Sequence, residues 1–162
     1  AAVAVRRCVE EGVRHEWGND DAFRLAAWKG DAVLSLEVRE LVEAKFGQEM
    51  DLAELTRVAR LSVTIEALVR VCQGIGLHRL VRAPIHRTTK ADADLVKAML
   101  WELHSCRIQP KLFGENAASL ASAALKTILD MLTEAGHVVL EQAPSCALQS
   151  FSSLPREERL HQ

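Results

Sequence analysis

DAFRLAAWKGDAVLSLEVRELVEAKF occupies residues 21–46, and its apolar side chains recur at the spacing of an amphipathic α-helix. Four of them fall at i, i+4, i+7 and i+8 on one helical face: Leu34, Val38, Leu41 and Val42. The turn-forming residues 18–20 precede this stretch, and Gly47 follows it, where a glycine can adopt the left-handed conformation that ends many helices. The stretch therefore predicts a long helix with one face buried in a core.

A spacing near 3.6 residues continues along the rest of the chain, and no segment alternates as a strand does. We therefore expect an all-α protein. Asp51 and Glu54 form a capping-box pattern at a helix start, and Asn116 is a suitable N-cap. Pro110 and Gly114 predict a loop over residues 107–115. The remaining predicted elements are helices over residues 3–15, 51–73, 92–106 and 117–135, and a short helical turn with a loop over 78–91.

The composition is that of an ordinary globular protein. The chain has 162 residues, of which 49% are hydrophobic, and its net charge is −2. Charged residues interrupt every apolar stretch before about 18 residues, so we expect no membrane-spanning helix. Because the net charge is slightly negative, contact with nucleic acid requires a local basic patch. The well-separated cysteines show no zinc-ligand spacing and predict small core residues in a reducing compartment: Cys8, Cys72, Cys106 and Cys146.

The end of the chain differs in composition from the part before it. From Pro144 it is rich in serine and contains a second proline, Pro155, followed by charged residues. We therefore predict one helical domain over residues 1–135 and an extended tail over residues 136–162, which requires a partner to become ordered.

The segment Lys29-Gly30-Asp31-Ala32-Val33-Leu34 resembles the signature helix of the ribonuclease III family, in which an aromatic and an aliphatic residue precede Gly-Asp-Ala-Val-Leu. Residues 54–77, beginning Glu54-Leu55-Thr56-Arg57 and ending Gly76-Leu77, are similar to the next helix of that family. Residues 90–99, KADADLVKAM, are similar to its later acidic helix. The resemblance covers roughly residues 20–104 and implies a ribonuclease III-type helical domain. No double-stranded-RNA-binding domain is visible after residue 135.

In that family, four acidic side chains hold divalent metal ions for RNA hydrolysis, because Mg²⁺ prefers hard oxygen ligands. The resemblance places two of these aspartates at Asp31 and Asp94. Ala27 stands where a glutamate is expected four residues before Asp31, and Arg24 stands at the earlier acidic position. Lys97 stands where a glutamate is expected three residues after Asp94. The resemblance therefore implies a vestigial acidic site in a chain that is not an enzyme, with no catalytic residue, bound metal or cofactor.

Lys97 itself suggests what replaces the metal. Asp94 and Lys97 are three residues apart on one helical face, so the ammonium group can pair with Asp94 and also with Asp31. We hypothesise that Lys97 is a structural counter-ion that offsets the repulsion between the two carboxylates. In the alternative interpretation, Lys97 points to solvent.

Trp28 stands at the aromatic position that, in ribonuclease III dimers, fills a socket on the other subunit. The resemblance therefore implies a dimer contact at Trp28, of a kind for which aromatic side chains are well suited. A core tryptophan is the alternative. Trp17 and Trp101 are assigned to the core.

Basic side chains are concentrated in the middle of the chain. Residues 51–110 carry 9 basic and 6 acidic side chains, against 7 and 10 in residues 1–50. Such a patch can bind phosphates without base specificity, or it can be solvated or face an acidic partner. Within residues 70–91 there is no acidic residue, and the candidate RNA-binding residues are Arg70, Arg79, Arg82, Arg87 and Lys90.

Together these features predict a non-catalytic, RNA-contacting subunit of a large ribonucleoprotein, similar to the inactive ribonuclease III-like proteins of the mitochondrial large ribosomal subunit. Its expected partners are rRNA or other structured RNA and neighbouring proteins. We expect it in the mitochondrial matrix, and it can form a homodimer or a heterodimer. One alternative is an inactive dimer partner of an active ribonuclease III subunit in an RNA-processing or RNA-editing complex. Another is a metal-dependent double-stranded RNA endonuclease, for which Glu37 or Asp92 would have to supply relocated ligands.

Overall fold

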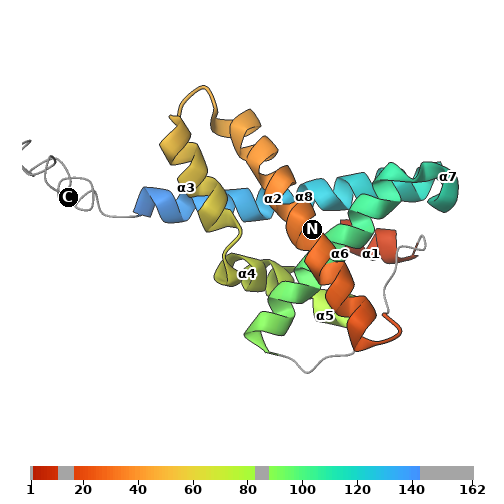
Figure 1. Cartoon of the computed structure of the whole chain (residues 1–162). Helices are drawn as coiled ribbons and strands as arrows, with labels where there is room; N and C mark the ends of the chain where they lie inside the picture. Colours follow the sequence, from red (N-terminus) through yellow and green to blue (C-terminus); the bar gives the residue numbers. More distant parts are fainter. Residues whose placement is uncertain (1, 11–16, 83–87, 143–162) are drawn as a thin grey trace, which may run out of the picture.

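A computed structural model describes residues 2–10, 17–82 and 88–142 of the chain (Figure 1). The predicted all-α class is confirmed, since these residues form helices and no strand. The elements are α1 (Ala2–Glu10), α2 (Asp20–Phe46), α3 (Leu52–Ser62), α4 (Ile65–Ile75), α5 (Leu77–Leu80), α6 (Thr89–Ile108), α7 (Pro110–Phe113) and α8 (Glu115–Gln142). None of the described helices is both long enough and apolar enough to span a bilayer.

The most extensive packing in the fold is between α2 and α6, which cross near the centre of Figure 1. Gly30 is buried at this crossing, and a Cβ atom added to it would overlap the backbone carbonyl of Lys97. The absence of a side chain at Gly30 is therefore what brings the two helix backbones together. Deeply buried side chains from both helices fill the core beside the crossing, among them Phe23, Leu34, Met99 and Leu103.

The long helix α8 supports the other elements, packing against α1, α3, α4 and α6. Gly136 permits a second close approach, since an added Cβ would lie 2.8 Å from the carbonyl oxygen of Val58 on α3. The ring of His137 stacks on Phe46 at the end of α2, with 4.6 Å between the ring centroids. Together α2 and α3 form a helical pair held against α8.

Local capping explains where several helices start. Asn19 accepts a hydrogen bond from the Ala22 N–H and starts α2. The predicted capping box is confirmed, because Asp51 accepts from the Glu54 N–H while Glu54 accepts from the Asp51 N–H.

The prediction of one continuous helix over residues 51–73 is wrong, because the structure has two helices there. Thr64 has an extended backbone, and its hydroxyl accepts a hydrogen bond from the Ala67 N–H, so a new helix starts there. The chain therefore turns between α3 and α4. Gly47 ends α2 as predicted, but its φ of −63° is right-handed and not left-handed. Gly76, with φ of 69°, ends α4 in the left-handed conformation.

The predicted loop over residues 107–115 is also wrong, because α6 continues to Ile108 and Pro110 starts the short helix α7. Proline is tolerated at this first helical position because its missing N–H has no partner there in any case. The last helix starts at Glu115, so Asn116 lies inside it, and it continues to Gln142. Residues 136–142 are therefore helical and not extended tail, while residues 143–162 lie outside the described residues.

Three of the four cysteines occupy the core, as predicted. Cys8, Cys72 and Cys106 are buried and form no disulfide, and burial raises the pKa of the Cys106 thiol. Cys146 lies outside the described residues, as does the part of the predicted first helix beyond Glu10.

Replacing Gly30 with alanine is expected to destabilise the fold by about 1–3 kcal/mol, because the new methyl group must push α2 away from α6. Urea denaturation measures the change. The matched control is Gly18→Ala, where an added Cβ meets nothing within 4 Å. Equal midpoints for Gly30→Ala and the wild type would contradict the close crossing.

Asp130 on α8 joins α2 to α8 through charge. Its carboxylate lies 2.8 Å from Lys45 Nζ and 2.8 Å from Lys126 Nζ. Burial alone would raise the pKa of Asp130, but hydrogen bonds from the two lysines and their charges lower it below its ordinary value of 3.8.

Asp130→Asn is therefore expected to lose about 0.5–1 kcal/mol of stability at neutral pH. Because the folded pKa is lowered, the contribution is fully present above the unfolded-state pKa and disappears as the pH falls through the lower folded pKa. Thermal denaturation between pH 7 and pH 2 measures this, with the exposed Glu49→Gln as control. A stability difference that persists unchanged at the acid end would refute the assignment.

Candidate functional site

The side chains of Asp31 and Lys97 form an ion pair across the crossing of α2 and α6. Lys97 Nζ lies 2.7 Å from an oxygen of Asp31. The Lys97 side chain is 22% exposed and that of Asp31 is 57% exposed, so the pair lies at the edge of the core. Gly30, adjacent to Asp31, contacts the Lys97 backbone and fixes this register. The alternative in which Lys97 points to solvent is therefore wrong.

The neighbouring positions do not complete an acidic cluster. Asp94 is partly exposed on α6, and no ion pair joins it to another described residue, so Lys97 pairs with Asp31 and not with Asp94. Ala27 lies on the buried side of α2. Arg24 is exposed and pairs with Asp20, one turn earlier on the same helix, at 2.7 Å.

This set of side chains does not suit a divalent metal ion. A cation from the protein already neutralises Asp31, and Ala27 contributes only a neutral methyl group, which cannot bind a cation. Within residues 2–10, 17–82 and 88–142, no group of three or more His, Cys, Asp and Glu side chains is placed to hold a metal.

The two carboxylates considered as relocated ligands are engaged elsewhere. The Glu37 carboxylate accepts hydrogen bonds from both terminal nitrogens of Arg107, one of them at 3.3 Å. His104 lies beside both, with Nδ1 3.0 Å from Arg107. Asp92 is buried near the start of α6 and takes part in an interaction of its own. Glu37 is therefore held by Arg107 and not at the Asp31–Lys97 pair.

An aromatic contact lies beside the ion pairs Asp31–Lys97 and Glu37–Arg107, which together form a polar seam between α2 and α6. Lys29 Nζ lies 4.7 Å from the ring centroid of Trp101, which is a cation–π distance. The Trp101 ring also faces His104, with centroids 6.2 Å apart. This network was not predicted, because its members are about 70 residues apart and meet only through the helix crossing.

Trp28 is on the surface of α2 and is 73% exposed, so the alternative of a core tryptophan is wrong. Trp17 is buried against Phe23, and Trp101 packs partly against the core, as predicted. Further exposed side chains continue from Trp28 along one side of α2 at helical spacing. We call this set the α2 apolar strip: Leu25, Trp28, Ala32 and Leu36. The dimer contact at Trp28 stays a prediction.

Four of the five candidate RNA-binding residues are described, and all four are exposed. Arg70 lies on α4, Arg79 on α5, Arg82 just after α5 and Lys90 at the start of α6. These three helices contact one another, and α4, α5 and the start of α6 occupy the lower part of Figure 1. No ion pair joins any of them to another described residue. This set, which we call the basic surface, consists of Arg70, Arg79, Arg82 and Lys90. Arg87 lies outside the described residues.

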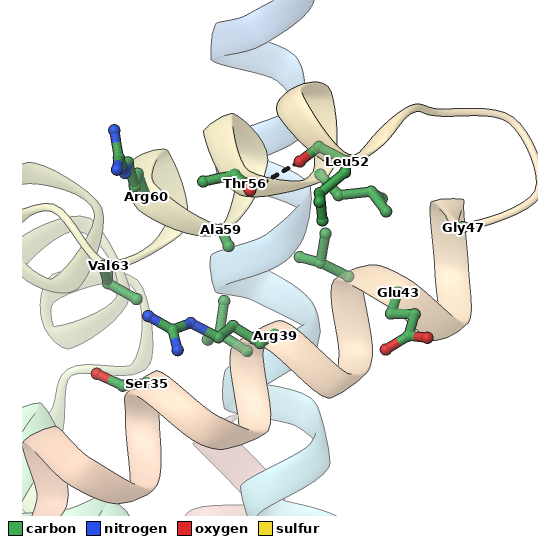
Figure 2. Close-up of a pocket in the computed structure, with 12 residues that line it drawn as sticks. Ser35, Arg39, Glu43, Gly47, Leu52, Thr56, Ala59, Arg60 and Val63 are labelled. Atoms are coloured by element: carbon green, nitrogen blue, oxygen red, sulfur yellow. Dashed lines mark hydrogen bonds between the residues drawn. The ribbon is translucent and has the colours of Figure 1, made fainter.

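A groove between α2 and α3, with a volume of about 570 Å³, was not predicted (Figure 2). Its floor is apolar and its rim carries charged side chains. The spacing of apolar residues along α3 could have revealed it, because four of them share one helical face at i, i+3, i+7 and i+11: Leu52, Leu55, Ala59 and Val63.

No protein-family model, curated protein or solved structure matches the chain. The similarity to ribonuclease III therefore rests on the three sequence motifs and their order.

The Asp31–Lys97 pair is expected to contribute about 0.5–1 kcal/mol of coupling, the range for partly exposed ion pairs. A double-mutant cycle with Asp31→Asn and Lys97→Met measures the coupling from urea denaturation. The control cycle combines Asp31→Asn with Lys111→Met, on the exposed face of α7, and should give additive effects. Additive effects in the first cycle as well would show that the contact does not stabilise the fold.

Proposed function

We propose that the chain is a non-catalytic ribonuclease III-type domain that serves as a structural, RNA-contacting subunit of a large ribonucleoprotein, specifically the large subunit of the mitochondrial ribosome. The observation that carries the proposal is the ion pair between Lys97 and Asp31. It puts a cation from the protein where the family motif requires a metal-binding glutamate.

The loss of catalysis follows from charge. Two-metal hydrolysis requires several carboxylates around the ions, whereas this position offers Asp31 already neutralised, Asp94 one turn from Lys97, and Ala27. The ammonium group performs the electrostatic task of the metal in the folded state, but it cannot activate water as a bound metal ion does. This arrangement argues against the alternative of a metal-dependent endonuclease.

RNA contact is assigned to the basic surface. Exposed guanidinium and ammonium groups without an ion-pair partner among the described residues are free to bind phosphates, and such contacts need no base specificity. The α2 apolar strip supplies a separate surface for a protein neighbour, with Trp28 as its anchor. The domain thus offers one set of exposed side chains to RNA and another set to protein, as a subunit within a larger particle requires.

A second candidate function is supported by the α2 apolar strip. An exposed tryptophan flanked by exposed leucines suits pairing with another helical domain, so the chain can be the inactive partner of an active ribonuclease III subunit. In that complex the partner would cut RNA, and this chain would contribute shape and charge.

Gradient sedimentation of the tagged chain from its native cell in Mg²⁺ buffer, followed by mass spectrometry, tests the proposal. We expect it to sediment with the large mitochondrial ribosomal subunit. Sedimentation in a smaller particle with an active ribonuclease III subunit would favour the second candidate. Mg²⁺-dependent cleavage of duplex RNA by the purified chain would overturn the non-catalytic assignment.

The basic surface is tested with purified chain and RNA. Arg79→Ala with Arg82→Ala should lower the slope of log affinity against log salt by about 2, since each lost phosphate contact removes about 1. The control is Lys111→Ala on α7, which is exposed but outside the basic surface. An unchanged slope would assign RNA contact to another face.

A further inference from the structure

The groove between α2 and α3, which we call the α2–α3 groove, has no part in the proposed function. Its floor consists of side chains from the facing sides of the two helices: Val38, Val42, Leu55, Ala59 and Val63. In Figure 2, α8 runs behind both helices, so the groove opens away from the support that α8 provides. Its volume of about 570 Å³ is large enough for several side chains of a bound peptide.

The charged side chains on the rim are unevenly placed. Arg39 and Arg60 lie toward the end formed by Ser35 and Val63, while Glu43 lies toward Gly47 (Figure 2). Both arginines are exposed, and neither forms an ion pair with another described residue. An apolar groove with two such arginines at one end fits a peptide in which apolar side chains are followed by carboxylates.

The chain itself contains such a sequence directly after α8. Residues 148–158 read LQSFSSLPREE, in which three apolar residues at spacing three are followed by an acidic pair. The apolar residues are Leu148, Phe151 and Leu154. The acidic pair is Glu157 and Glu158, flanked by Arg156 and Arg159, so the match is one of side-chain order and not of net charge.

The attachment point is close to the groove. Figure 1 shows the C-terminal end of α8 emerging beside α3. One to two turns before that end, Gly136 and His137 contact Ser62 and Phe46, the sequence neighbours of Val63 and Gly47 in the groove lining. The six Cα–Cα steps from Gln142 to Leu148 can span up to about 20–22 Å when extended, which exceeds half the circumference, about 16–19 Å, of the helix that the connection must pass.

We propose that residues 148–158 bind in the α2–α3 groove of their own chain, with Leu148, Phe151 and Leu154 on the apolar floor and the acidic pair against Arg39 and Arg60. Binding within one chain is favoured because a short connection gives the segment an effective concentration in the millimolar range.

Disulfide crosslinking in the full-length chain tests the proposal. The variant carries Thr56→Cys in the groove lining, Ser153→Cys in the tail and Cys146→Ser. The other native cysteines are buried and do not compete. The control replaces Thr56→Cys with Ser122→Cys on the exposed side of α8, about 30 Å of helix from Gln142.

Under mild oxidation we expect a disulfide between positions 56 and 153 to form within one chain, at least about tenfold faster than in the control. Adding Arg39→Glu and Arg60→Glu should reduce the rate to that of the control, and adding Glu157→Arg and Glu158→Arg to those changes should restore it. Circular dichroism checks that each variant is folded.

Three results would overturn the proposal. Equal rates at positions 56 and 122 would mean that the tail does not favour the groove. Disulfide-linked dimers, visible on a non-reducing gel and increasing with protein concentration, would mean that the tail of a second copy occupies it. Insensitivity to the arginine and glutamate reversals would refute the assigned charge pairing.

Discussion

The close crossing of α2 and α6 is the constraint on which the rest of the structure depends. Because Gly30 has no side chain, the α2 backbone lies directly against the carbonyl of Lys97. That contact brings Asp31 and Lys97 together at the edge of the core, and it aligns Glu37 with Arg107 further along the same two helices. The ion pairs between α2 and α6 therefore depend on one short separation between backbones.

Regular helices and their caps could be predicted from the sequence, because the necessary information is local. The bounds of α2 follow from the apolar spacing between residues 21 and 46, and the start of α3 follows from Asp51 and Glu54. The break at Thr64 was missed, since the apolar spacing continues across it and only the cap hydrogen bond reveals it. The extension of α8 past residue 135 was also missed, because its last turns pack on α2 and α3, which are distant in sequence.

The candidate site was only partly predictable, because its contacts join helices that are distant in sequence. Lys97 was singled out because a cation stands where a motif requires an acid, and it was expected to pair with Asp94, from the spacing along one helix, and also with Asp31. The structure shows the pair with Asp31, which is formed across the helix crossing, and no ion pair between Lys97 and Asp94. The Glu37–Arg107–His104 network and the α2–α3 groove depend entirely on how helices distant in sequence pack together.

The three tryptophans differ in environment, so intrinsic tryptophan fluorescence can distinguish the surface of α2 from the core. Trp17 is buried and donates to Glu102 at 3.3 Å, Trp101 is half-buried beneath a lysine ammonium, and Trp28 stands in water. The sequence contains no tyrosine, so no tyrosine emission overlaps that of the three tryptophans. Iodide therefore quenches the Trp28 emission preferentially, and a shift of the red-edge emission to shorter wavelength reports, without any label, that the surface of α2 has been covered.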